Sequence, residues 1–166
     1  MTVNITKPAI NLREKLSELD FAKVPFQKMP AGSVLQVVSG ELGYYVVTSS
    51  SSYSDIGLSA TITPTSTSSK ILVCLNLLAG NTTGGSENYI QILRGATVIR
   101  IHERWVYSAG GFTSVHGAAM FEDSPSSTSA LVYKVQYKTN TGAFRVNDYT
   151  SSNINKSNLT LMEIAQ

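Results

Sequence analysis

The sequence has a single cysteine and few charged residues. Cys74 is the only cysteine among 166 residues, which excludes an internal disulfide and a cysteine-based zinc site. It stands in the apolar run 70–78, where a small buried side chain is a better interpretation than a reactive thiol. Charged residues make up 14% of the chain, below the usual quarter or so, and the formal net charge is only +2. This balance gives no support for nucleic acid or an anionic membrane surface as a partner.

Long apolar runs and targeting signals are also missing. No stretch is apolar over the length needed to cross a bilayer, so we expect no membrane insertion. The first residues lack the charged and apolar regions of a signal peptide. We therefore expect a chain that is made in a cytoplasm and kept there until it is assembled or released.

Catalytic motifs are absent as well. The two histidines, His102 and His116, belong to no zinc-binding pattern, and His102 is best interpreted as a satisfied surface side chain. The glycine-containing segment 81–86 is followed by strand-like sequence, not by the helix that a phosphate-binding loop requires. The acidic residues do not have the alternate spacing of a calcium loop. We predict that the protein is not an enzyme and uses no metal or cofactor.

The opening segment has a helical pattern. Residues 11–20 place Leu12, Leu16 and Leu19 on one stripe, with charged residues on the other side. A helix of about ten residues is marginal alone in water, so its leucines need a partner. Prolines follow at positions 25 and 30, which indicates a connector. We predict an anchor helix and linker over residues 1–32 and a separate β domain over residues 33–166.

Everything after Gly32 is typical of β structure. Serine and threonine are abundant, and no further helical pattern occurs. Gly95 and Ala96 separate two strands and suit a type II′ turn. The predicted strands are 33–39, 43–48, 56–63, 71–78, 89–94, 97–102, 114–121, 129–138, 142–147 and 157–164. About ten short strands with turn signals between them indicate a β-sandwich or jelly roll.

The last predicted strand is apolar on both faces. Leu159 and Leu161 point one way, and Met162 and Ile164 point the other way. Such a strand is buried on both sides. It either lies beside the symmetry axis of a trimer, which makes these four residues interface residues, or it lies mid-sheet inside one subunit.

Aromatic and basic residues cluster between positions 94 and 111. The candidate receptor-binding residues are Arg104, Trp105, Tyr107, Gly110 and Gly111. Exposed tryptophan and tyrosine beside arginine suit recognition of a carbohydrate or protein. The alternative is that the aromatics belong to the core and the arginines are simply solvated.

Several segments resemble bacteriophage virion proteins. Residues 5–20 resemble the start of small tail-associated and fibre-like proteins of tailed phages from aquatic bacteria. Residues 54–73, and the pairing of the hairpin at 92–95 with the final strand 159–164, resemble segments of phage fibre heads. The resemblance implies a trimeric jelly roll of the complement or tumour-necrosis-factor type, located in the virion after synthesis in a bacterial host.

Two functions follow from this resemblance. The first is a short tail fibre or receptor-binding head that attaches by its N-terminus and contacts a host surface glycan or receptor. The second is a capsid decoration protein that stabilises the phage head. The partners in either case are two further copies of the chain and other tail or capsid proteins. No long shaft, coiled coil or collagen-like repeat lies between the anchor and the domain, which favours the second function. The fibre-like N-terminus and the aromatic and basic loop residues favour the first, which is the function that we expect.

Overall fold

The computed structural model describes residues 29–147 and 156–166, and this part of the chain is built from strands without a helix. The predicted anchor helix, with Leu12, Leu16 and Leu19, lies outside the described residues. The strands are β1 (Val34–Leu42), β2 (Val46–Thr48), β3 (Ser54–Ile62), β4 (Lys70–Asn81), β5 (Ser86–Arg94), β6 (Thr97–Ser108), β7 (Thr113–Asp123), β8 (Leu131–Thr139), β9 (Phe144–Val146) and β10 (Ser157–Ile164).

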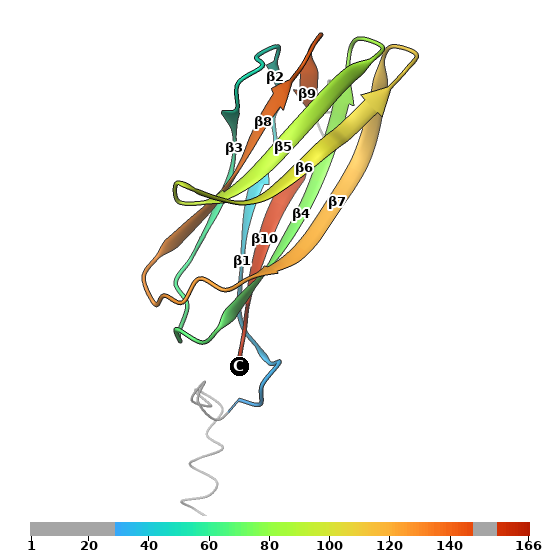
Figure 1. The fold of residues 1–166 in the computed structure, drawn as a ribbon. Helices are drawn as coiled ribbons and strands as arrows, with labels where there is room; N and C mark the ends of the chain where they lie inside the picture. The colour runs from blue at the N-terminus through green and yellow to red at the C-terminus, as the bar shows by residue number, and fades with distance from the viewer. Residues whose placement is uncertain (1–28, 148–155) are drawn as a thin grey trace, which may run out of the picture.

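The strands form two sheets that pack face to face (Figure 1). In the first sheet, β10 lies between β1 and β4, and β7 pairs with the other edge of β4. The short strands β9 and β2 extend this sheet beyond the end of β10. The second sheet has the order β3-β8-β5-β6. All of these pairings are antiparallel, so the prediction of an all-β sandwich is confirmed.

Alternating apolar residues build the core between the sheets. In β8, Tyr133, Val135 and Tyr137 are buried, while the residues between them face outward. This is the alternation that the sequence predicts for this strand. In β4, Ile71, Val73 and Leu75 are buried in the same way. The inner faces of both sheets therefore supply one continuous core.

The hairpin of β5 and β6 has the predicted two-residue turn. Gly95 has a φ of 59°, and Ala96 is not among the residues with positive φ. A positive φ at the first position alone is what a type II′ turn requires. β6 is longer than predicted, however, because it continues to Ser108.

The two ends of the sandwich differ. At one end the chain enters β1 beside the C-terminus: the N–H of Gly32 donates to the carbonyl of Ala165 at 2.8 Å, and the N–H of Ala165 donates to Ser33 at 2.9 Å. The loops 82–85, 109–112 and 140–143 lie together at the opposite end (Figure 1). We call these three loops the tip.

Candidate functional site

The candidate receptor-binding residues begin at an irregular part of β6. Between the pairs Asn88–Val106 and Ile90–His102, β6 has three residues where β5 has one. This bulge includes Arg104, whose φ of 54° lies in the left-handed region. A non-glycine residue there costs roughly 1–2 kcal/mol, and bulges re-aim side chains. The strained bulge therefore sets the direction in which the candidate side chains of β6 point.

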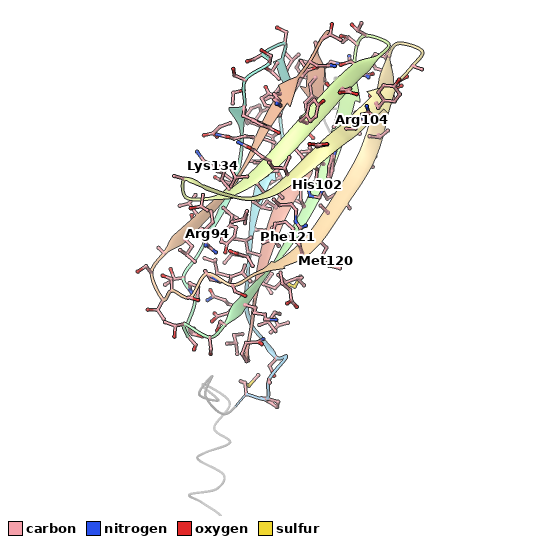
Figure 2. All side chains as sticks on the ribbon, in the orientation of Figure 1. Arg94, His102, Arg104, Met120, Phe121 and Lys134 are labelled. Carbon is pink, nitrogen blue, oxygen red and sulfur yellow. The ribbon has the colours of Figure 1, made fainter. Side chains whose placement is uncertain are left out.

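Arg104 belongs to a network on the outer face of the second sheet (Figure 2). Its guanidinium lies 2.6 Å from Oε1 of Glu87, and the hydroxyl of Tyr89 donates to Oε2 of Glu87 at 2.5 Å. These contacts, the hydrogen bond from Tyr89 first, lower the pKa of Glu87. The guanidinium is also 5.7 Å from the ring centre of Tyr107, which is 52% exposed. Arg104 and Tyr107 thus share one accessible surface.

Trp105 does not belong to that surface. Its ring is half-buried and packs against the core. A Cβ on Gly117 would lie only 2.5 Å from Cζ2 of Trp105, so this indole needs a glycine opposite it in β7. This placement favours the alternative, an aromatic packed against the core, over the assignment of Trp105 to receptor binding.

His102 lies beside Trp105 and is not a satisfied surface histidine. The two rings make an edge contact with centroids 5.4 Å apart. Nε2 of His102 and Nε1 of Trp105 are buried without a hydrogen-bond partner among the described residues. Burial, together with Arg100, lowers the pKa of His102, so the ring is neutral at pH 7. The rings of His102 and Trp105 pack together where β6 lies beside β7.

Gly110 and Gly111 lie at the tip. Gly111 has a φ of 105°, a conformation that favours glycine. The loop 82–85 packs closely against the loop 109–112, because a Cβ on Gly84 would lie 2.6 Å from the carbonyl oxygen of Ala109. These glycines shape the tip and contribute no side-chain chemistry.

Phe112 is the tip residue that sequence reasoning missed. It is 62% exposed, and the guanidinium of Arg145 lies 4.0 Å from its ring centre. A cation so placed holds an aromatic ring through a cation–π contact. The available signal was an aromatic residue directly after two loop glycines.

The candidate interface residues of β10 divide between two environments. Leu159 and Leu161 are fully buried in the core of the single subunit, so their assignment to a trimer interface is wrong. The mid-sheet alternative is correct, because β1 and β4 flank β10. Met162 and Ile164 face the other way and are half-buried on the outer face of the first sheet.

That outer face carries a group of neighbouring apolar side chains. Val37, Met162 and Leu72 are cross-strand neighbours, and Cys74 lies beside Met120 in the next row. Met120 is 71% exposed and Val37 is 54% exposed. A hollow of about 440 Å³ opens here, lined by residues that include Cys74, His116, Ala118, Met120 and Asn158. Cys74 is thus half-buried at a surface, and burial raises the pKa of its thiol.

Groups for metal chemistry do not converge in the described residues. Residues 29–147 and 156–166 contain no cluster of three or more histidine, cysteine, aspartate or glutamate side chains that could hold an ion.

Over the same ranges, the structure has no helix with the length and apolarity to span a bilayer.

No family model and no curated protein matches the chain. Two solved structures are similar over most of it. Dimeric latent PorU from Porphyromonas gingivalis is 9% identical with a TM-score of 0.39, over 82% of this chain and 14% of that one. The VP2 subviral particle of infectious bursal disease virus is 13% identical with a TM-score of 0.37, over 81% of this chain and 38% of that one. The chain therefore spans less than half the length of either structure.

Proposed function

We propose that the protein is a non-enzymatic phage virion protein, a short tail fibre or receptor-binding head that attaches by its N-terminus and displays a β domain to the host surface. The observation that carries the proposal is that the two ends of the sandwich differ. The chain enters beside Gly32 at one end, and the tip loops gather at the opposite end (Figure 1). An attachment point and a contact surface are thus separated by the full length of the strands.

The sandwich is proposed to be a jelly roll of the complement or tumour-necrosis-factor type. The sheet orders β1-β10-β4-β7 and β3-β8-β5-β6 support this, because in each sheet a strand from β1 to β5 alternates with a strand from β6 to β10. A head of this type is a trimer in the family that the sequence resembles.

The outer face of the first sheet is the proposed trimer interface. Large exposed apolar side chains on a soluble protein mark an interaction surface, and Val37 and Met120 lie on this face together with Met162. The opposite outer face has a row of hydrogen-bonded polar groups beside exposed apolar side chains such as Ile101 and Tyr107. There, Asp55 accepts a hydrogen bond from Gln136 at 2.6 Å, and Gln136 accepts one from Gln91 at 2.6 Å. Met120 is more exposed than either apolar residue, at 71%, and lines the hollow on the first sheet, which supports association through that sheet.

Capsid decoration is the second candidate function. The connection between linker and domain favours it: Gly32 is already bonded to Ala165, and β1 begins at Val34. The described chain therefore has no shaft that would hold the domain away from a particle surface.

Adsorption competition tests the proposal. Full-length protein added to host cells should block adsorption of phage particles. A variant lacking residues 1–28 should still block adsorption but should be missing from purified particles. Protein that never competes, and that is present in particles at the copy number of the major capsid protein, would establish decoration instead.

A further inference from the structure

A lysine on the second sheet lies between two tyrosine rings. Nζ of Lys138 is 4.7 Å from the ring centre of Tyr53 and 4.9 Å from that of Tyr89. Tyr89 is its cross-strand neighbour in β5, and Tyr53 directly precedes β3. Among the described residues, this ammonium has no carboxylate in ion-pair contact, unlike Lys134 on the same strand, which contacts Asp55 at 3.1 Å. Lys138 is therefore a cation held between two rings without an ion-pair contact among the described residues.

A hollow of about 160 Å³ opens beside this lysine. It is lined by Ser51, Tyr89, Lys138, Thr139 and Asn140. Oδ1 of Asn140 accepts the N–H of Glu87 at 2.7 Å, and its Nδ2 group is a further donor of this lining residue. The ammonium and the Nδ2 group can only donate hydrogen bonds. The hollow therefore suits a ligand rich in acceptors that carries negative charge.

Nearby carboxylates affect the site unequally. Glu87 is paired with Arg104 at 2.6 Å, so its charge is compensated. Glu103 forms no ion pair within the described ranges, and after burial it is the second cause that raises the pKa of Tyr53. The negative charge of Glu103 therefore repels an anionic ligand, so a variant that removes this charge tests whether the ligand is anionic.

We propose that Tyr53, Lys138, Tyr89 and the hollow beside them bind an acidic saccharide. The ligand's carboxylate pairs with Lys138 through a charge-assisted hydrogen bond, and its hydroxyl groups accept from Asn140. The Tyr89 ring supplies a flat apolar wall for the sugar ring. The size of the hollow admits one sugar unit of a longer chain. This inference rests on the proposed surface recognition, and it places the contact on the second sheet beside the tip loop 140–143.

A glycan array with neutral and acidic saccharides, probed with the full-length protein, gives the first test. We expect the bound saccharides to carry carboxylates. Tetragalacturonate and its methyl ester provide a matched pair for titration of any uronate hit, because esterification removes the charge and adds only a methyl group to each carboxyl. Binding confined to neutral saccharides, or no binding to any acidic saccharide, would overturn the proposal.

Three variants test whether the saccharide binds at Lys138. Lys138→Met keeps the apolar stem between the rings but removes the charge, and it should lower affinity by about tenfold or more. Lys134→Met on the same strand face is the control and should bind normally. Glu103→Gln removes a repelling charge and should raise affinity. Equal loss in both lysine variants, or weaker binding by Glu103→Gln, would contradict the site.

Particle adsorption separates this inference from the proposed function. If Lys138→Met particles adsorb normally while free protein still competes, recognition stands and the saccharide site is wrong. If the protein binds acidic saccharides as expected but never competes for adsorption, the site stands and the proposed function is wrong.

Discussion

At the scale of single residues, Arg104 shows where the fold accepts strain. Its φ of 54° falls inside the β6 bulge and aims the guanidinium at Glu87. Backbone strain of this kind is maintained where the surrounding structure fixes it, and it often accompanies a functional surface. The strain can be separated from the ion pair by comparing two substitutions that both remove the charge.

Arg104→Gly should be more stable than Arg104→Ala by about 1 kcal/mol, because glycine adopts positive φ freely and alanine does not. The measurement is the free energy of unfolding from urea titration. Elsewhere in a strand the order is reversed, and the neighbouring Glu103 provides the control: Glu103→Ala should be more stable than Glu103→Gly. An alanine preference at position 104 would show that the backbone there is relaxed.

Trp105 and Gly117 form a second residue-scale pair. The Cβ of an alanine at position 117 would lie 2.5 Å from the indole ring, so Gly117→Ala should lower the melting temperature. In a Trp105→Ala background the same change should cost much less, since the ring is gone. Thermal unfolding of the four proteins in this double-mutant cycle gives the coupling. Additive effects would mean that the two residues do not contact each other.

Trp105→Ala alone should lower stability by roughly 2–4 kcal/mol, because it removes a large ring packed against the core. Tyr107→Ala should change stability little, since Tyr107 is 52% exposed. Chemical denaturation of both variants measures the contrast. A stable Trp105→Ala protein with reduced adsorption would return Trp105 to the recognition surface.

At the scale of strands, Glu163 ties β10 to the segment after β3. Oε2 accepts from Nε2 of Gln36 at 2.6 Å, and Oε1 accepts from the N–H and the hydroxyl of Thr65, both at 2.7 Å. Burial alone would raise the pKa of Glu163, but these hydrogen bonds lower it overall, below its ordinary 4.5. A lowered carboxyl pKa stabilises the fold above the unfolded value, and this contribution is lost as pH falls through the folded one.

Stability should therefore decrease as pH falls below about 4.5. Glu163→Gln should be less stable at neutral pH and should have a flatter profile in acid, as measured by denaturant titration at several pH values. Glu122→Gln is the control: Glu122 makes an exposed ion pair with Lys70, so its profile should follow the wild type. A steep acid loss in Glu163→Gln would assign the effect to other carboxylates.

The strands also show what sequence could predict. The clean alternation of β8, the apolar run of β4 and the Gly95 turn are local patterns, and the structure confirms all three. β6 was predicted too short, because a bulge breaks the alternation. The same bulge places Trp105 against the core, which no local pattern indicates. The row of Tyr53, Lys138 and Tyr89 depends on register among three chain segments that are distant in sequence. No local pattern reveals such a row.

At the scale of the whole molecule, each outer face carries exposed apolar side chains beside polar ones. The second sheet has a hydrogen-bonded row through Asp55 and Gln136, and Ile101 and Tyr107 are exposed on it. The first sheet presents Val37 and Met120, together with the hollow beside Cys74. A protein with such a face is expected to cover it, and the proposed trimer covers it with copies of itself.

Met120→Lys should convert the proposed trimer to monomer without unfolding it, because Met120 is 71% exposed in the single subunit and a lysine there contacts only solvent. Sedimentation velocity at micromolar concentration measures the oligomer, and circular dichroism checks the fold. Ile101→Lys is the matched control, since Ile101 is 51% exposed on the second sheet and should leave the trimer intact. If both variants remain trimeric, the first sheet is not the interface; if the wild-type protein is itself a monomer, the proposed trimeric head is wrong.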